Sequence, residues 1–517
     1  MSRRAGVLIP LFSIRARERS WGLGEIPDLV PFARWAQRAG FSVVQILPVN
    51  QPSGGQESPY AACTSFALDP VYIALDAVED FHGAGGIAAL PADLKTRLEA
   101  ARAAPRVRWE DVRPVKEAAL RLAYRHFAAT APGTARAAEL EAFANEEGDW
   151  LDEYTLFSAL HDEQGDVAWT DWPAPLRERD PAALAAARER LADAIAEKRY
   201  VQWLANTQWQ VARDEAGRLG VELMGDLPFL VGGDSADIWS HAGDFSLDQR
   251  TGVPPDAFSV DGQDWGLPVF RWDVMARGGH VWMRARTRRA ADLYGLFRVD
   301  HVVGLYRTFY RPASGPHNGP GKFTPENEHD QTLLGEYNLM LLDGRQEGSG
   351  GRVIAEDLGV VPDFVRASLR KLGIPGYRVL RWEKDGAVFR DPAKWPPLSV
   401  ATTGTHDTES LSDWFDALDD KERRAFLEIP ALAPLRNRLP RQFDVDVRDA
   451  ILACVYDSGS DLILLPFMDA FGARERVNVP GTVNAENWTY RMPIDVDAID
   501  DVDRLSGLAE RSGRSRR

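Results

Sequence analysis

The sequence predicts an α/β protein built as a (β/α)8 TIM barrel. Three observations predict it: eight apolar runs of strand character, helix-like stretches between them, and acidic residues at the ends of three runs. Most runs are rich in Val, Ile, Leu and Phe without strict alternation, as expected of parallel strands covered on both faces. A doubly wound open sheet is the competing topology. The eight runs lie near residues 7–12, 42–47, 221–225, 296–300, 352–356, 376–381, 398–404 and 461–466.

Helical spacing of apolar residues separates several of these runs. In residues 28–39, the side chains of Leu29, Phe32, Ala33 and Ala36 recur at intervals of three and four, and Gly40 supplies a stop. Residues 362–372 repeat this pattern and end at a glycine. Repeated alternation of strand and helix with eight strands favours the barrel over the open sheet.

Two insertions interrupt the alternation within what we expect to be a single elaborated barrel over residues 1–517. The first, residues 80–200, is rich in Ala, Arg, Glu and Leu and predicts a helical insertion. The second, residues 226–281, is dense in Gly, Pro, Asp and Trp and predicts a loop-rich insertion over the active site. For residues 505–517 we expect a disordered, solvated tail.

Composition excludes several classes of function. The chain has 517 residues, 44% of them hydrophobic, and a formal net charge of −16, which is not the basic footprint of a nucleic-acid partner. No apolar run approaches the length of a membrane span, so we expect no membrane partner. Cys63 and Cys454 are too few for a disulfide framework or a metal cluster. They fit buried thiols in a reducing cytoplasm, and we predict a cytoplasmic protein.

Three acids follow predicted strands: Asp300, Glu356 and Asp407. In a (β/α)8 barrel the carboxyl ends of the strands converge on one mouth, where the chemistry takes place. Two carboxylates there could cleave a glycosidic bond, one as nucleophile and one as general acid/base. Arg298 lies two residues before Asp300, on the same side of the strand, and its charge would keep Asp300 ionised. An acid/base at Glu356 would need a pKa raised by burial or by negative neighbours.

Each acid alone has a simpler structural explanation. Arg298 and Asp300 could form a buried salt bridge, and Glu356 and Asp357 could be ordinary loop acids that cap the next helix. His406 and Asp407 could be a metal pair, but the spacing suggests no third ligand, so we predict no metal and no other cofactor. Together, on one predicted face, the acids favour catalysis. Trp265, in a polar glycine-rich loop, is the tryptophan we expect to be exposed and functional.

Many short motifs in order resemble those of one enzyme family. They are Trp21-Gly-Leu-Gly24, Gln45-Ile-Leu-Pro48, Ser58-Pro-Tyr60, Ser65-Phe-Ala67, Gly225-Asp-Leu-Pro228, Asp234-Ser-Ala-Asp237, Gly252-Val-Pro-Pro-Asp256, Gly262-Gln-Asp-Trp-Gly266, the three acid segments, Asn478-Val-Pro-Gly-Thr-Val483 and Asn487-Trp488. On these motifs the chain resembles, nearly end to end, the 4-alpha-glucanotransferases of the amylomaltase type (glycoside hydrolase family 77). The resemblance implies a barrel with inserted subdomains and no separate C-terminal β-domain.

The resemblance also implies roles for individual residues. Asp300 matches the nucleophile, Glu356 the acid/base, and Asp407 the acid that binds sugar hydroxyls and favours the distorted ring. Six further residues match substrate-binding positions: Arg298, His301, His406, Tyr60, Asp226 and Trp265. The implied reaction moves a segment of an α-1,4-glucan to the 4-hydroxyl of an acceptor by retaining double displacement. The implied partners are α-1,4-glucan oligosaccharides or polysaccharides; the sequence predicts no oligomeric state.

Two other functions are alternatives, and three departures from the family pattern bear on the choice. An α-amylase-like hydrolase or debranching enzyme would use the same acids, and a catalytically weak glucan-binding protein would have lost their use. Asp69 stands where the family has Asn, Leu267 where Gly-Asn-Pro is usual, and Thr408-Glu409 where Asn-Asp is usual. These positions bear on donor length, acceptor preference and the ratio of transfer to hydrolysis, but none removes a catalytic acid.

Overall fold

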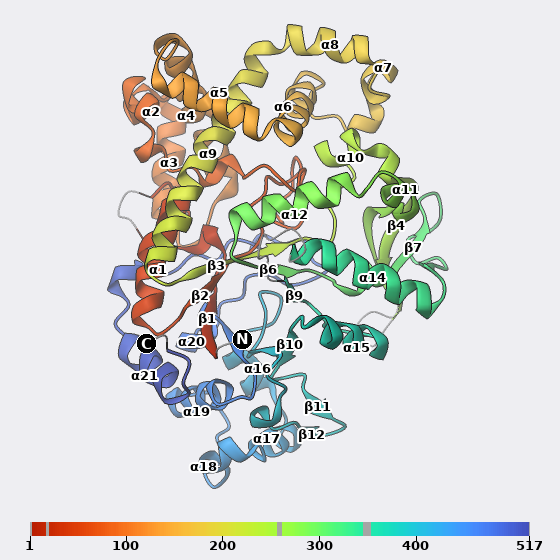
Figure 1. Ribbon diagram of the computed structural model, residues 1–517. Helices are drawn as coiled ribbons and strands as arrows, with labels where there is room; N and C mark the ends of the chain where they lie inside the picture. Colours follow the sequence, from red (N-terminus) through yellow and green to blue (C-terminus); the bar gives the residue numbers. More distant parts are fainter. Residues whose placement is uncertain (1–2, 17–19, 256–260, 345–352, 516–517) are drawn as a thin grey trace.

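Eight parallel strands close into a barrel in the computed structural model, which describes residues 3–16, 20–255, 261–344 and 353–515 (Figure 1). The first strand pairs with both the second and the last, which confirms the barrel and rules out the open sheet. Each predicted run overlaps one barrel strand. They are β1 (Arg4–Leu8), β2 (Val43–Gln45), β3 (Glu222–Leu227), β6 (Leu296–Val299), β9 (Val353–Ala355), β10 (Gly376–Val379), β13 (Ser399–Thr402) and β14 (Leu462–Pro466).

The strand boundaries differ from the prediction mainly at the amino terminus. The run predicted at 7–12 is strand only up to Leu8, and the strand begins at Arg4. Pro10 lacks an N–H to donate and precedes a 3-10 turn, Leu11–Ser13, which ends the strand early. The barrel strands are buried almost throughout, which explains why their sequences are apolar without alternation.

The two helices predicted in detail form close to the expected positions. Helix α1 (Leu29–Arg38) buries the predicted apolar face, and Gly40 follows it with a φ of 84°. Helix α15 (Asp363–Leu372) ends at Gly373, whose φ of 68° is the left-handed conformation typical of a helix terminus. These glycines end the helices because residues with a Cβ adopt that conformation at a cost.

Residues 80–200, for which we expected a helical insertion, lie between β2 and β3. Figure 1 shows their helices as a layer to one side of the barrel, with the long α9 running from this layer back along the barrel. Helix α9 packs against α1 and β3, so it joins the insertion to the barrel wall. The helices are α2 (Glu79–Gly83), α3 (Ala92–Ala103), α4 (Trp109–Thr130), α5 (Ala135–Glu146), α6 (Gly148–Glu163), α7 (Ala174–Arg177), α8 (Pro181–Arg190) and α9 (Ala192–Arg218).

Residues 226–281 contain a β-hairpin that the loop-rich prediction missed. Strands β4 (Phe245–Val253) and β5 (Gln263–Phe270) pair antiparallel and join β7 (Thr308–Pro312) and β8 (Lys322–Thr324) in the order β5-β4-β7-β8. Glycines and prolines within these strands obscured their signal. The short helices α10 (Ala236–Ser240) and α11 (Trp272–Arg277) flank the hairpin. Residues 256–260 of this segment lie outside the described residues.

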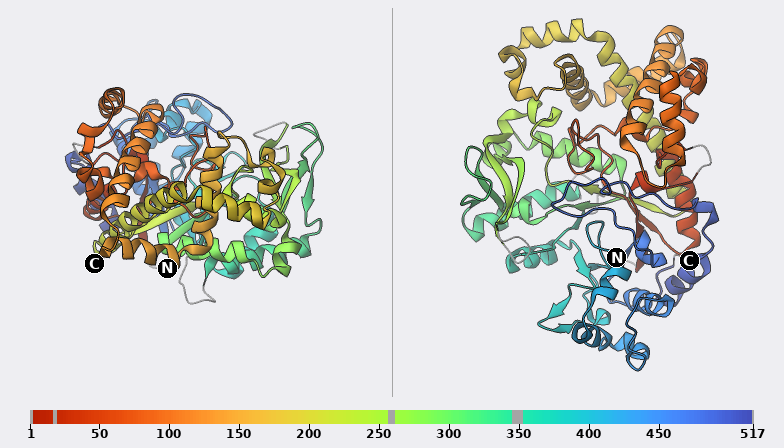
Figure 2. Two further views of the ribbon diagram at one scale, coloured as in Figure 1. Left: turned by 90° about the horizontal axis from the view of Figure 1, so that it is seen from above. Right: turned by 180° about the vertical axis from the view of Figure 1, so that it is seen from behind.

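The expectation of a disordered tail from residue 505 is wrong for the part that the structure describes. Helix α21 (Val502–Arg511) covers its start, and Arg514 is fully buried. The Arg514 guanidinium donates to the backbone oxygens of Arg4, Tyr456 and Ser460. This contact ties the two ends of the chain together, and they lie near one another in Figure 1 and in the right-hand view of Figure 2. Residues 516–517 are not described.

The remaining helices and short strands complete the outer layer and the loops. They are α12 (Val281–Leu293), α13 (Val303–Tyr306), α14 (Glu328–Asp343), β11 (Lys384–Asp385), β12 (Val388–Phe389), α16 (Leu411–Ala417), α17 (Asp420–Leu427), α18 (Ala433–Arg436), α19 (Val445–Tyr456) and α20 (Phe467–Phe471). Over the described ranges, none of the helices combines the length and the apolar character needed to span a membrane.

Candidate active site

The three predicted acids follow barrel strands at the same mouth. Asp300 directly follows β6, Glu356 directly follows β9, and Asp407 lies in the loop after β13. Strands β6 and β9 are hydrogen-bonded neighbours, and the Glu356 N–H donates to the oxygen of Val299 at 3.0 Å. The ladder therefore continues past the strand ends and sets Asp300 and Glu356 side by side.

One buried guanidinium contacts both of these acids. Arg298 Nη2 lies 2.7 Å from Asp300 Oδ1 and 3.9 Å from Glu356 Oε2. These contacts hold the two carboxylate oxygens within roughly 7 Å of each other, a range that includes the ~5 Å separation of retaining glycosidases. Asp300 is the more exposed of the two acids, with 28% of its side chain accessible against 12% for Glu356. The predicted Arg298–Asp300 pair thus exists, and it is shared with the second acid.

A further acid, Asp226, holds Arg298 in place. Arg298 Nη1 lies 2.8 Å from both carboxylate oxygens of Asp226, which is completely buried. Burial raises the pKa of Asp226, and the Arg298 guanidinium opposes this rise. The Tyr60 hydroxyl donates to Asp226 Oδ2 at 2.8 Å. Asp226 therefore orients the guanidinium that faces the two candidate catalytic acids.

Glu356 has the environment predicted for a proton carrier. Its Oε2 accepts from the His301 N–H and its Oε1 from the Leu358 N–H, both at 2.8 Å. Burial raises the pKa of Glu356 to about 7, with Arg298 opposing the shift and the charge of Asp300 adding to it. The prediction of a raised pKa is confirmed. The capping alternative is wrong, because Pro362 occupies the N-cap of α15 without a side-chain hydrogen bond.

Asp407 lies across the mouth and is held by partners from the C-terminal part of the chain. Asn478 Nδ2 donates to Asp407 Oδ1 at 2.7 Å, and His406 Nε2 lies 3.4 Å from Asp407 Oδ2. The Tyr60 ring stacks on His406 at 5.2 Å, with an interplanar angle of 17°. Asn478 belongs to the 478–483 motif but is not among the nine predicted site residues, because it lies 71 positions from Asp407 in the sequence.

An aromatic cluster forms the other side of the site. The His301 ring meets Trp265 edge-on at 4.8 Å and Phe229 at 5.6 Å. Burial lowers the pKa of His301 to about 4, so the ring is neutral at physiological pH. Trp265 was expected to be exposed but is only partly so, because its indole packs on His301. Phe229 was missed, since nothing in its local sequence distinguishes it from a core residue.

The nine predicted site residues therefore belong to one connected group. Tyr60, Asp226, Arg298, Asp300 and Glu356 are linked by hydrogen bonds and ion pairs. Tyr60 stacks on His406, which contacts Asp407. His301 donates its backbone N–H to Glu356, and its imidazole packs on Trp265. Within the described part of the chain, no cluster of three His, Cys, Asp or Glu side chains is arranged to hold a metal ion.

One departure from the family pattern has a structural explanation away from the acids. Asp69 accepts from both terminal nitrogens of Arg113, at 3.2 and 3.0 Å, and its Oδ1 also accepts from the Val71 N–H. A carboxylate makes this two-point pair with arginine and an amide does not. The residue therefore serves the packing of α4 on the 69–72 turn.

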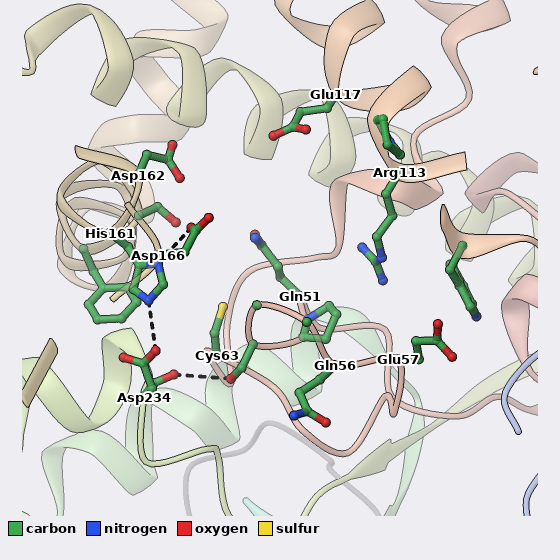
Figure 3. Close-up of a pocket in the computed structure, with 18 of the residues that line it drawn as sticks. Gln51, Gln56, Glu57, Cys63, Arg113, Glu117, His161, Asp162, Asp166 and Asp234 are labelled. Atoms are coloured by element: carbon green, nitrogen blue, oxygen red, sulfur yellow. Dashed lines mark hydrogen bonds and ion pairs between the residues drawn. The ribbon is translucent and has the colours of Figure 1, made fainter. Parts of the chain in front are cut away.

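A cavity of about 440 Å³ lies apart from the acids, between helix α6 and the 51–57 segment (Figure 3). Among the described residues that line it, none of the nine predicted site residues occurs. Figure 3 shows His161 between two carboxylates: its Nε2 lies 2.9 Å from Asp234 Oδ2 and its Nδ1 3.3 Å from Asp166 Oδ1. A carboxylate only accepts, so both ring nitrogens must donate, and this arrangement is that of an imidazolium.

Replacing His161 by glutamine is expected to lower stability in a pH-dependent way. The hydrogen bond to Asp234 raises the pKa of His161, so the contribution is fully present below the unfolded value of about 6.5 and is lost as pH rises through the raised value. We expect a loss of roughly 0.5–1 kcal/mol at pH 6, after allowing for solvent screening, and a smaller loss at pH 9. Thermal unfolding at both pH values measures the difference.

His82 supplies the matched control. Its Nε2 contacts the backbone oxygen of Asp76 at 3.0 Å, not a carboxylate. His82→Gln therefore shows what the loss of a histidine with a single backbone contact does to the unfolding midpoint at each pH. An equal loss at both pH values for His161→Gln would contradict the imidazolium assignment.

Comparisons with known proteins agree with this geometry. A family model described as 4-alpha-glucanotransferase, glycoside hydrolase family 77, matches residues 9–496. The chain is 30% identical to a 4-alpha-glucanotransferase of Chlamydia pneumoniae, over 99% of this chain and 95% of that protein. It is 32% identical to a 4-alpha-glucanotransferase of Thermus thermophilus, over 89% of each. The amylomaltase of Streptococcus agalactiae in complex with acarbose has the same fold, with a TM-score of 0.84 at 23% identity, covering 99% of this chain and 100% of that chain. The chain belongs to the 4-alpha-glucanotransferase family, glycoside hydrolase family 77.

Proposed function

We propose that this protein is a 4-alpha-glucanotransferase that moves α-1,4-glucan segments to the 4-hydroxyl of an acceptor glucan or glucose by retaining double displacement. The observation that carries the proposal is the pair of unlike carboxylates facing one guanidinium, Asp300 paired at 2.7 Å and Glu356 buried with a raised pKa. A nucleophile needs a positive partner to orient it and an acid must be protonated; Arg298 pairs with Asp300, and burial favours the protonated form of Glu356. The names of the relatives support the same activity.

In the first half-reaction Asp300 acts as nucleophile. A carboxylate oxygen of Asp300 attacks the anomeric carbon of the donor, and the glycosidic bond breaks toward the leaving sugar. Glu356 gives its proton to the leaving oxygen, so the departing chain carries a neutral 4-hydroxyl. The product is a β-linked glycosyl-enzyme. Arg298, held by Asp226, keeps Asp300 oriented for this attack.

In the second half-reaction the roles of the acids reverse. Glu356, now a carboxylate, removes the proton from the 4-hydroxyl of the acceptor, whose oxygen attacks the anomeric carbon and releases Asp300. Two inversions leave the new bond in the α configuration. Asp407 binds sugar hydroxyls and stabilises the distorted ring in both steps, held by Asn478.

The aromatic and histidine residues bind the sugar rings on either side of the bond that breaks. Tyr60 and His406 stack together next to Asp407, and Trp265 and His301 pack together next to Glu356. The β4–β5 hairpin carries Trp265 to the mouth, and we propose that residues 226–281 cover the site. Excluding water there favours transfer over hydrolysis, because water and the acceptor hydroxyl compete for the same intermediate.

Incubation with maltotriose is expected to give glucose together with longer maltodextrins. Disproportionation keeps the number of reducing ends constant, whereas a hydrolase or debranching enzyme would raise it steadily without lengthening any chain. Chain lengths resolved over time, with reducing ends measured in parallel, separate the two. If maltotriose is returned unchanged in a sensitive assay, the protein is instead a glucan-binding protein with weak or no catalysis.

We further propose a cytoplasmic location and neither a nucleic-acid nor a membrane partner beside the glucan substrate. Cys63 and Cys454 are free and buried, which supports a reducing compartment. The formal net charge of −16 supports a neutral ligand rather than a nucleic acid or an anionic membrane surface.

A further inference from the structure

We propose that Arg381 is a positioning residue for Asp407, acting through the loop that joins β13 to α16. The inference rests on the proposed role of Asp407 in the reaction. Arg381 lies two residues after β10, is 3% exposed, and was not selected from the sequence. Its guanidinium joins both ends of residues 403–409, the segment in which Asp407 lies.

Arg381 and Asp469 bind both ends of residues 403–409, and we call this pair the clamp. Arg381 Nε donates to the backbone oxygen of Thr403 at 2.9 Å, and Nη1 donates to the backbone oxygen of Glu409 at 2.9 Å. Nη1 also lies 3.1 Å from Glu409 Oε1. The planar guanidinium therefore fixes the separation between two backbone oxygens that flank Asp407.

Asp469 at the start of α20 completes the clamp from the other side. Its Oδ2 accepts from the Thr403 hydroxyl at 2.6 Å, and its Oδ1 accepts from the Leu411 N–H at 2.8 Å. Arg381 Nη2 lies 4.0 Å from Asp469 Oδ2, so the buried positive charge faces a buried negative charge. The two residues hold the loop by four hydrogen bonds to Thr403, Glu409 and Leu411.

Inside the clamp, the loop is folded back on itself by threonine hydroxyls. Thr408 Oγ1 accepts from the Thr405 N–H at 3.1 Å and donates to the Thr405 oxygen at 3.0 Å. The Asp407 N–H donates to Thr405 Oγ1 at 3.2 Å. A Cβ at Gly404 would lie 2.4 Å from Thr408 Oγ1 and 3.0 Å from Arg381 Nη2, so only glycine fits between the two. A shift at the clamp is thereby passed to Asp407.

This arrangement gives a structural role to Thr408 and Glu409, which stand where the family has Asn-Asp. Glu409 supplies both a backbone oxygen and a carboxylate to Arg381, and Thr408 supplies the internal hydroxyl of the loop. Glu409 thus binds Arg381 directly, while Thr408 folds the loop between the two ends that Arg381 joins. Misplacement of a catalytic group by about 1 Å can cost on the order of 100-fold in rate.

The decisive experiment is a double-mutant cycle between Arg381→Met and Asp407→Asn, with kcat and KM for maltotriose disproportionation measured separately. We expect Arg381→Met to lower kcat on the order of 10- to 100-fold with little change in KM. In the Asp407→Asn background the same substitution should have almost no further effect on kcat, because Arg381 acts on the reaction only by positioning Asp407. Additive losses would overturn the inference.

The cycle also separates failure of this inference from failure of the proposed function. If Asp407→Asn retains full activity, the proposed role of Asp407 is wrong. If Asp407→Asn is impaired and Arg381→Met either retains wild-type kcat or adds its loss to that of Asp407→Asn, only the positioning role is wrong.

Arg423 provides a matched structural control. It is 5% exposed, donates to the backbone oxygens of Phe415 and Leu418, and lies over an aromatic ring at 5.4 Å, much as Arg381 lies over Trp414 at 5.3 Å. Arg423→Met should lower the unfolding temperature but leave kcat of the folded fraction unchanged. If it lowers kcat as much as Arg381→Met does, the effect of Arg381 is general destabilisation.

Arg381→Lys tests the clamp when Arg381→Met does not fold. Lysine keeps the charge but lacks the fork that reaches Thr403 and Glu409 together. We expect kcat of Arg381→Lys to lie between the wild-type and Arg381→Met values, with the same loss of effect in the Asp407→Asn background. Wild-type kcat in this variant would show that charge alone suffices and would overturn the clamp.

Discussion

Asp300→Asn is expected to lower the rate of maltotriose disproportionation by at least about 10⁴-fold while the protein remains folded. The amide is a poor nucleophile, so the glycosyl-enzyme no longer forms. The fold should survive because the Asp300 side chain is 28% exposed, and Arg298 keeps both of its contacts to Asp226. Initial rates on maltotriose, with the unfolding temperature as a check, measure the effect. Wild-type activity in this variant would sink the assignment of Asp300.

The stereochemistry of azide rescue tests the role more directly. In Asp300→Ala, azide can enter the space of the missing carboxylate and attack an α-maltotriosyl fluoride donor from the β face. A single inversion then gives the β-glycosyl azide. Product configuration by NMR decides the matter, because a nucleophile and an acid/base variant give opposite anomers. An α-azide from Asp300→Ala would contradict the role.

The barrel could be predicted because its strands carry their own signal. A strand that is buried on both faces, such as β9 or β14, must be apolar at nearly every position, whatever surrounds it. The β4–β5 hairpin could not be predicted in this way. Its strands are partly exposed, contain Gly252 and Pro268, and depend on pairing with β7, which lies about forty residues further along the chain in sequence.

The acids of the site could be predicted because Asp300 and Glu356 directly follow their strands and Asp407 lies in the short loop after its strand. The contacts that hold these acids could not be predicted, because the partners come from distant parts of the chain. Asp226 pairs with Arg298 across 72 positions, and Asn478 reaches Asp407 across 71. Local sequence around Arg381 shows only a charged residue after a strand, and nothing in it indicates burial against Glu409. The tail prediction failed for the same reason, since the carbonyl oxygens around Arg514 come from the start of the first barrel strand and from the segment before the last one.

Glu356→Gln is expected to lower the rate on maltotriose on the order of 10³-fold or more and to leave α-maltotriosyl fluoride as a far better donor. Glutamine cannot protonate the leaving sugar oxygen, whereas fluoride leaves without a proton. Azide should then intercept the β-glycosyl-enzyme and give the α-glycosyl azide after two inversions. A β-azide from this variant, or equal losses on the two donors, would contradict the acid/base role.

The pH profile gives an independent check on Glu356. Its pKa is raised to about 7 by burial, and the acid form is the one that starts the reaction, so kcat/KM of the wild type on maltotriose should fall as pH rises through about 7. With the fluoride donor the rate of the glycosylation step should not fall as pH rises through about 7, because fluoride leaves without a proton. The two profiles are compared on the same enzyme. If both donors lose activity equally between pH 6 and 8, the fall belongs to another group.

The same shift sets the sign of a stability effect. Because the folded-state pKa of Glu356 lies above its unfolded value, the neutral acid contributes stability that is complete below about pH 4 and is lost as pH rises through about 7. Glutamine does not titrate, so the unfolding temperature of Glu356→Gln should rise relative to that of the wild type as pH increases from 5 to 8. Glutamine has one side-chain oxygen where glutamate has two, so one of the two peptide N–H groups faces the amide NH2 and loses its acceptor. This loss lowers the unfolding temperature of the variant by the same amount at every pH. A difference that stays flat over this range would show that Glu356 is already ionised at pH 5, and hence unable to serve as the acid.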